Sequence, residues 1–444
     1  MTPLRDRDSS LTSTALLLQG SIPVAFGTSV AVSIVAFIGG FPALAMPAPL
    51  FLSLLLAVIL AGGIVAGRSL PGGILCAALG GTGAGLITLL ILGGLFFEVA
   101  GGEAPSTPYF RALGFIALCT SVSAVGGAIS RGGGRAVDDV HRFASVAAIA
   151  TLVLVAIGGL VTSEEAGLAV PDWPTSFEAN MFLLPLSRMV GGVFYEHAHR
   201  LFGALVGLTT ISLAVFLWLA DGRRSVRIIG AIVSVQVVIQ GIIGGYRVTL
   251  AEYGETVGSL ALRVFHGINA QFFLTLMVLL VVMTSRSWRE LTPRADERAM
   301  TDRTIGNLAL LAAIAQLLLG ALVRHIDRMW VMPHILGAFL VVVGVIGCAV
   351  RATALHNDCA PLRRNGVALL IAVLLQLVLG FVSLAITSPV AARAESSGLL
   401  ETLLVTAHQT LGALILAGIA CHLAWILRLL PLAKAVGHRS PHAG

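Results

Sequence analysis

Charged residues are scarce in this sequence: they occupy 11% of its 444 positions, and aromatic residues occupy only 6%. Hydrophobic residues reach 57%, which leaves too little polar surface to cover a set of soluble domains. The shortage of charge therefore excludes an ordinary soluble protein. It predicts a chain that crosses a membrane many times.

Cysteine is also rare, and the five cysteines lie where no disulfide is expected. Four are inside apolar runs and one is in a loop on the predicted inner side: Cys76, Cys119, Cys348, Cys421 and Cys359. Because disulfides form in oxidising compartments, none of these positions suits a structural bridge. No pair has the spacing of a CxxC metal site either.

Long apolar runs dominate what is present. A helix needs about 20 mostly apolar residues to cross the hydrocarbon, because its backbone polar groups must be satisfied within the segment. Twelve such runs can be counted, at residues 18–40, 49–67, 73–97, 109–130, 143–162, 198–219, 226–246, 263–284, 304–323, 332–351, 365–386 and 402–427. We therefore predict an all-α polytopic membrane protein with about twelve transmembrane helices.

The basic residues predict how these spans are oriented. An even number of spans puts both termini on one side, and the loops of that side hold most of the basic residues: Arg5, Arg7, Arg68, Arg131, Arg135, Arg142, Arg223, Arg224, Arg227, Arg286, Arg289, Arg294, Arg298, Arg303, Arg351, Arg363, Arg364, Arg428, Lys434 and Arg439. The positive-inside rule then places both termini in the cytoplasm, with the spans in the cell's inner membrane. The net charge of +6 follows from this orientation and does not indicate nucleic-acid binding. The first run is too long for a typical signal sequence, although Ala-Leu-Ala at residues 43–45 leaves cleavage open.

The last eight spans share two recurring patterns, which indicate an internal duplication. Three odd-numbered spans contain a glutamine followed four residues later by a glycine: Gln240 with Gly244, Gln316 with Gly320, and Gln376 with Gly380. The four even-numbered spans each open with a histidine on the outer side: His199, His266, His334 and His408. We expect the glutamines to form hydrogen bonds between helices. Two pseudo-symmetric four-helix bundles, each with a histidine pair, are predicted.

These histidine pairs are suited to a flat, wide ligand. The residue four positions after each histidine is Gly or Ala, namely Gly203, Ala270, Ala338 and Gly412, and residues four apart share a helix face. Two neutral imidazoles from facing helices satisfy both axial positions of a haem iron, which is our preferred interpretation. Zinc is disfavoured because it needs four close ligands. A single histidine near a helix end is more often an interfacial group, and His325 and His422 are interpreted in that way.

Only one of the four histidines is preceded by a carboxylate one turn earlier. Glu196 precedes His199, whereas Arg263, Val331 and Val405 hold the matching positions in the other spans. The two sites are therefore expected to do different jobs. From the residues alone, Glu196 either takes part in the chemistry or has a structural role, as a helix cap or as a partner of Arg200.

Several stretches resemble the haem A synthase family of cytochrome oxidase assembly. The resemblance covers about residues 140–430 and rests on IGGLVTSEEAGLAVPDWP, YEHAHRLFGALVG, QGIIGGYRVT, FHGINA, QLLLGALVRH, PHILGA and TAHQTLGALI. It implies an eight-helix core that oxidises the C8 methyl group of haem O to the formyl group of haem A. By motif, His334 and His408 would bind a haem b cofactor, and His199 and His266 would hold the haem O substrate. Glu196 would be needed for the reaction.

The sequence departs from this family in two places. Residues 163–195 lack the cysteine pair that some members have, which puts a thiol-based entry of electrons in doubt. Residues 1–130 have no counterpart in the eight-span core, and they either dock a haem O synthase or an oxidase subunit or buttress the bundles. The expected domains are 1–135 as a four-span region, 136–296 as the bundle of the substrate haem, and 297–444 as the bundle of the cofactor haem.

The resemblance leaves the mechanism open. Conversion of a methyl group into a formyl group removes four electrons and adds one oxygen. That oxygen comes either from dioxygen, after His334 or His408 leaves the iron, or from a water that Glu196 positions and deprotonates. An unidentified electron acceptor or donor is implied. The rival interpretations are a membrane electron-transfer protein with two haems b and a non-catalytic haem-binding assembly factor.

Overall fold

The computed structural model describes residues 13–69, 73–97, 106–130, 138–251, 256–387 and 398–432. The regular structure of these residues is helical, apart from an isolated bridge between Ser176 and Ala179. The predicted domain limit at residues 135 and 136 and the basic residues of both chain ends lie outside the described residues.

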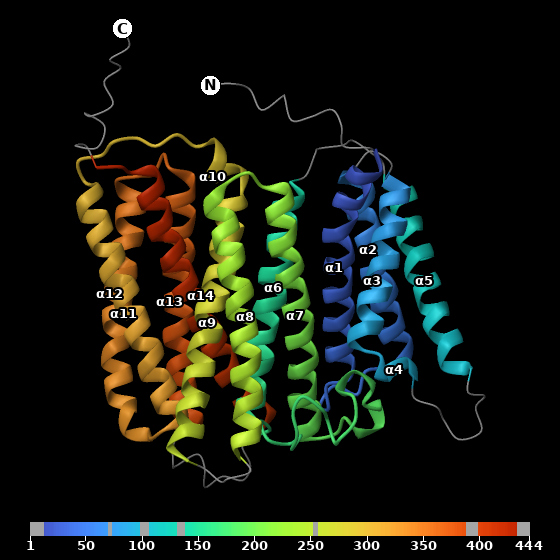
Figure 1. The fold of residues 1–444 in the computed structure, drawn as a ribbon. Coiled ribbons are helices and arrows are strands. Elements are labelled where there is room, and N and C mark those ends of the chain that lie inside the picture. Colours follow the sequence, from blue (N-terminus) through green and yellow to red (C-terminus); the bar gives the residue numbers. More distant parts are fainter. Residues whose placement is uncertain are drawn as a thin grey trace. The chain divides into compact units, whose positions relative to one another are not determined.

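Twelve helices in the described part of the chain are long and apolar enough to cross a membrane, which confirms the predicted number of spans and a multi-pass membrane protein. They are α1 (Ser13–Gly39), α2 (Ala48–Ser69), α3 (Gly73–Ile91), α5 (Thr107–Ile129), α6 (Asp139–Ser163), α7 (Gly192–Ala220), α8 (Arg224–Ala251), α9 (Val257–Thr284), α11 (Ala299–His325), α12 (Val331–Ala354), α13 (Ala360–Ile386) and α14 (Leu399–Leu429), shown in Figure 1. Short helices α4 (Gly94–Phe97), α10 (Arg286–Glu290), η1 (Met181–Leu183), η2 (Leu186–Arg188) and η3 (Arg328–Trp330) lie between them.

Several helices extend beyond the apolar runs because polar residues cap them. α9 begins at Val257 and not near residue 263, since Thr256 and Ser259 form a reciprocal capping box at its start. The predicted run 73–97 is instead broken after Ile91. A Cβ atom at Gly94 would lie 2.2 Å from the carbonyl oxygen of Leu184, so the chain after α3 has glycines where the loop before α7 passes.

The chain forms two compact units, which are described separately. The first contains Met1–Val153 and Ala169–Ala220, and the second contains Leu154–Leu168 and Asp221–Gly444. The predicted first bundle, α6 to α9, is thus shared between the units, and its assembly stays a prediction.

Small residues pack the helices of the first unit closely. A Cβ atom at Gly63 of α2 would lie 2.0 Å from the backbone oxygen of Ser123 in α5, so the two backbones are in direct contact. The hydroxyl of Ser123 donates a hydrogen bond to the carbonyl of Ala77 in α3 at 2.7 Å. At the other side of α1, the ring of Phe37 stacks on Phe194 of α7, with centroids 5.3 Å apart. The first unit therefore includes α7 as well as the N-terminal helices.

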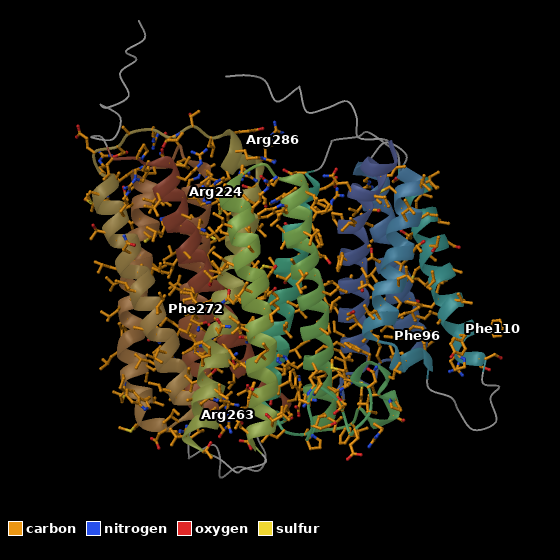
Figure 2. All side chains as sticks on the ribbon, viewed as in Figure 1. Phe96, Phe110, Arg224, Arg263, Phe272 and Arg286 are labelled. Carbon is orange, nitrogen blue, oxygen red and sulfur yellow. The ribbon has the colours of Figure 1, made fainter. Side chains whose placement is uncertain are left out.

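Four helices of the second unit surround a common core. α11, α12, α13 and α14 each pack against two of the others, and α9 packs against α14 and α11. Their core consists of Ala309, Ala313, Val341, Val345, Cys348, Leu369, Val373, Ile415, Leu416 and Ile419. Basic residues lie at both ends of this unit: Arg224 and Arg286 at one end and Arg263 near the other (Figure 2). In this bundle α12 packs against α11, the helix before it, and α14 packs against α13.

The contact between α2 and α5 gives a stability test. We expect Gly63→Ala to lower stability by about 2 kcal/mol or more, because the new methyl group meets backbone that cannot rotate away. The control is Gly114→Ala in α5, where a Cβ atom meets nothing within 4 Å and the expected change is under about 1 kcal/mol. Thermal unfolding of the purified protein in detergent measures both, and equal melting temperatures would contradict the backbone contact.

Candidate functional site

Three of the predicted ligand histidines share one structural arrangement in the second unit. In each case the glutamine on the preceding helix donates a hydrogen bond from Nε2 to the histidine's own backbone oxygen. The pairs are Gln240 and His266 at 2.9 Å, Gln316 and His334 at 2.9 Å, and Gln376 and His408 at 3.0 Å. The predicted interhelical role of the glutamines is therefore confirmed.

The glycine four residues after each glutamine lies beside the ring of the same histidine. A Cβ atom at Gly244, Gly320 or Gly380 would lie 3.1, 3.1 and 3.0 Å from the Cε1 atom of its histidine. Such a distance is shorter than most van der Waals contacts of real side chains. The glycines therefore give the rings the space that they occupy.

His334 and His408 face each other across the α11–α14 bundle. Their ring centroids are 6.4 Å apart and their planes cross at 74°. Two imidazoles on opposite sides of one metal ion need centroids roughly 6 Å apart, because each bond is about 2 Å and a ring nitrogen lies about 1 Å from its centroid. The Nδ1 atom of His408 is buried without a hydrogen-bond partner among the described residues, as suits a ring that is used as a ligand. The spacing and the donor type fit the axial ligands of a haem.

His199 and His266 lie in different units, on α7 and α9 respectively. Their pairing across one haem therefore stays a prediction. On α7, a Cβ atom at Gly203 or Gly207 would meet no heavy atom within 4 Å. The face of α7 that carries His199, Gly203 and Gly207 therefore has free space beside the two glycines. This space fits the flat ligand that was predicted from the small residues.

Glu196 is buried, with 4% of its surface exposed, and it fixes the loop before α7. Its Oε2 accepts a hydrogen bond from the amide of Val170 at 2.8 Å, and its Oε1 accepts one from Arg200 at 2.6 Å. Arg200 also donates to the backbone oxygens of Val170, Asp172 and Thr175 at 2.9, 2.6 and 3.1 Å. The pairing with Arg200, one of the sequence alternatives, is present. Because the side chains of Glu196 and Arg200 are both buried, removal of either leaves the charge of the other uncompensated.

Asp172 stabilises the same loop through hydrogen bonds to residues of the loop itself. This carboxylate accepts hydrogen bonds from the hydroxyl of Thr175 and from the amides of Phe177 and Glu178, the latter two at 2.6 and 2.8 Å. Burial raises the pKa of Asp172, but these hydrogen bonds together outweigh burial and hold the pKa below its ordinary value. The carboxylate thus stays ionised and keeps the turn closed.

The sequence analysis assigned no role to His197, which follows Glu196 on α7. The side chain is 1% exposed, and its Nδ1 lies 3.3 Å from the hydroxyl of Ser176 in the loop. The spacing of Glu196 and Arg200 and the Pro-Asp-Trp-Pro turn were the available signals that a loop would fold onto this helix.

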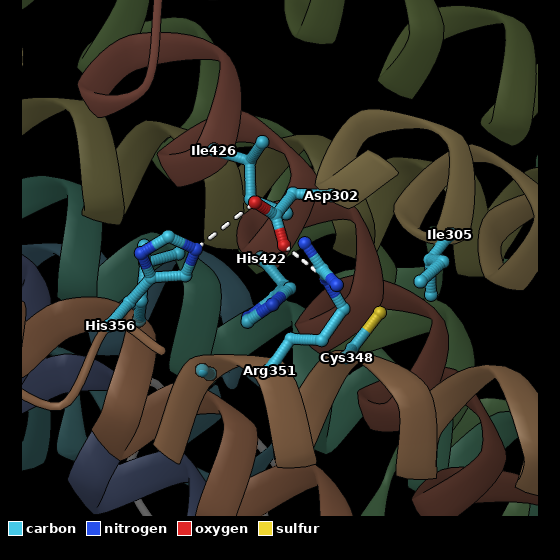
Figure 3. A pocket seen from close by; sticks show the side chains of 9 residues that line it. Asp302, Ile305, Cys348, Arg351, His356, His422 and Ile426 are labelled. Atoms are coloured by element: carbon cyan, nitrogen blue, oxygen red, sulfur yellow. Dashed lines mark hydrogen bonds and ion pairs between the residues drawn. The ribbon is translucent and has the colours of Figure 1, made fainter. Parts of the chain in front are cut away.

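A second polar cluster lies at the other end of α12 from His334 (Figure 3). Asp302 of α11 accepts hydrogen bonds from Arg351 at 2.6 Å and contacts His356 at 3.0 Å. His422, which was expected at the membrane interface, is instead buried beside them at 2% exposure and lines the same cavity of about 10 Å³. A cavity of this size holds about one water molecule. Among the described residues no group of three or more His, Cys, Asp and Glu is placed to bind a metal ion. The contacts of Asp302 join α11 to the C-terminal part of α12 and to His356 after it.

The low pKa of Asp172 predicts how the loop responds to acid. An unfolded aspartate titrates near pH 3.9, and the folded pKa is lower, so the carboxylate stabilises the turn above that pH. This contribution is lost as the pH falls through the folded pKa. We expect the amides of Phe177 and Glu178 to be protected from hydrogen exchange at neutral pH, relative to their intrinsic exchange rates, and to lose this protection in acid. In Asp172→Asn the protection should be low at every pH, and protection that does not change with pH in the unaltered chain would contradict this.

The contacts of Glu196 predict a graded pair of variants. Glu196→Ala should release the loop and cost about 3 kcal/mol, because Arg200 is left buried without its partner. Glu196→Gln should release it less, since the amide oxygen can still accept from Val170. Hydrogen exchange of residues 169–176 in the protein without haem measures this, with the exposed Glu178→Ala as control. Similar exchange in all three variants would contradict the inference that Glu196 holds the loop.

Comparison with known families finds a match for part of the chain. Residues 177–334 match the family model COX15-CtaA, which is described as cytochrome oxidase assembly protein. The match includes Glu196, His199, His266 and His334, whereas His408 lies beyond its end. A search of curated proteins found no match. Over this segment, the chain is similar to the COX15-CtaA family of cytochrome oxidase assembly proteins.

Proposed function

We propose that this protein is a haem A synthase, which oxidises the C8 methyl group of haem O to a formyl group. The observation that carries the proposal is the pair of imidazoles of His334 and His408, which face each other at 6.4 Å in the second unit. The family match adds a role in cytochrome oxidase assembly. A membrane protein of that family with a haem-sized ligand pair is best explained as an enzyme that acts on a haem.

The two histidine pairs are assigned different haems. His334 and His408 would hold a permanent haem b, and His199 and His266 would hold the haem O substrate. The bound haem b would supply one-electron oxidation and reduction. The open face of α7 at Gly203 and Gly207 supports the substrate assignment, because a substrate must enter and leave.

Glu196 is the proposed acid–base group of the reaction. It lies one turn before His199 on the same side of α7, next to the place where the substrate would be held. Its two oxygens each accept one hydrogen bond, and an ionised carboxylate has about four acceptor positions, so it can still hold a water or take a proton. The loop that Glu196 and Arg200 fasten would exclude bulk water from the site.

The proposal also implies partners and a location. Haem O must come from a haem O synthase, and the four electrons must leave through an acceptor that the sequence does not identify. The N-terminal helices, which pack on α7 inside the first unit, are the proposed docking surface for that synthase or for an oxidase assembly factor. We place the protein in the inner membrane among its lipids, with cytoplasmic termini and haem sites toward the outer side, as the basic residues predicted.

Analysis of extracted haems tests this function. The chain is expressed together with a haem O source, and the haems are separated by chromatography. We expect haem A from the unaltered chain, at least tenfold less haem A from Glu196→Ala, and no haem A from His334→Ala. The control is Asn307→Leu, which changes an exposed amide of α11 far from the histidines.

The same experiment separates the rival functions. Haem b and haem O that remain unchanged beside the intact chain would contradict the synthase and favour an electron-transfer protein or a carrier. Haem A that forms equally well in Glu196→Ala would remove Glu196 from the chemistry and leave it only as the clamp of the loop.

A further inference from the structure

We infer that Gln316 and Gln376 are positioning residues that set the planes of the two cofactor imidazoles before a haem is bound. The inference rests on the proposed function, because it assigns His334 and His408 to a haem iron. It extends that function to residues that touch neither the substrate nor the iron.

Each glutamine directs its hydrogen bonds to one residue. Besides the carbonyl of His334 at 2.9 Å, Nε2 of Gln316 lies 3.1 Å from Nδ1 and 3.3 Å from Nε2 of the same ring. Nε2 of Gln376 lies 3.0 Å from the carbonyl of His408 and 3.5 Å from its ring. The Oε1 atoms of both glutamines are buried without a partner in the described part of the chain. An amide that only joined two helices would use its oxygen as well, so these amides serve the histidines.

Glycine on the same helix as each glutamine leaves room for the histidine ring. Gly320 and Gly380 lie one turn after the glutamines, and a Cβ atom there would press on Cε1 of the ring. The amide thus fixes the backbone of the histidine and contacts its ring, and the glycine leaves the space that the ring occupies in this orientation. We infer that the amide contact and this space together set the plane of the imidazole.

The glycine beside the ring distinguishes these glutamines from a neighbouring one. Gln240 and Gly244 repeat the carbonyl hydrogen bond and the glycine contact at His266, although Oε1 of Gln240 accepts a hydrogen bond from Asn269 at 2.7 Å. Gln236 lies one turn earlier on the same helix and has no glycine four residues on; it donates to the side chain of Asn269 at 2.9 Å and to its backbone oxygen at 3.4 Å. Outer partners of this kind orient ligands and change metal affinity when they are removed.

The crossing angle makes the inference measurable. In a low-spin ferric haem, axial imidazoles with nearly perpendicular planes give a strongly anisotropic electron paramagnetic resonance (EPR) spectrum, whereas parallel planes give a rhombic one. The planes of His334 and His408 cross at 74°. We therefore expect an anisotropic low-spin signal from haem b in the unaltered chain.

The test compares five variants with the unaltered full chain in detergent, loaded with haem b. In Gln316→Leu and Gln376→Leu, we expect the anisotropic signal to become rhombic or split, and haem b affinity to fall about 10- to 100-fold. Gly320→Ala should shift the signal too, because it pushes the ring of His334 from the other side. Its control is Gly306→Ala on the same helix, where a Cβ atom is also 3.1 Å from its neighbour, but that neighbour is the flexible side chain of Leu423. The Asn307→Leu variant controls for loss of an amide from α11.

The outcomes distinguish this inference from the function on which it rests. If the unaltered chain binds haem b and the glutamine variants keep its spectrum and affinity, the glutamines only join helices and the inference is overturned while the synthase stands. A lower melting temperature with an unchanged spectrum has the same meaning. If a glutamine variant does not fold, Gly320→Ala decides, and an unchanged spectrum there overturns the inference. A chain that binds no haem b overturns both proposals.

Discussion

The hydrogen bond from a glutamine amide to a histidine carbonyl is the interaction on which the second unit depends most. In hydrocarbon, a polar group without a partner is costly, so a side-chain amide that reaches the next helix fixes both helices at that depth. Gln316 and Gln376 do this on opposite sides of one bundle. The two rings that result lie near enough to share a metal, and the side chain that contacts each ring is an amide.

In the first unit the buried ion pair of Glu196 and Arg200 holds the loop before α7 against that helix. The single guanidinium of Arg200 binds three carbonyls of the loop and the carboxylate of Glu196. Arginine suits this position because its donors diverge in a plane and it stays charged when it is buried. The polar residues at the mouth of α7 therefore have two purposes: they build the loop, and they place a carboxylate one turn from His199.

Part of this structure could be predicted from the sequence, because a bilayer permits few choices. The apolar runs predicted all twelve spanning helices, and the spacing of Gln316 and Gly320 predicted a contact with another helix. The burial of His197 and His422 could not be predicted, since it depends on which segments fold against them. The break after Ile91 was missed for the same reason, because its cause is a loop that lies more than eighty residues later in the chain.

That loop has two points of attachment within the first unit. Its carbonyls at Phe182 and Leu184 lie against Gly93 and Gly94, and its earlier part is held by Arg200. It therefore works like a short strap between the end of α3 and the start of α7. The end of α3 and the ion pair at the start of α7 are therefore held by one and the same loop.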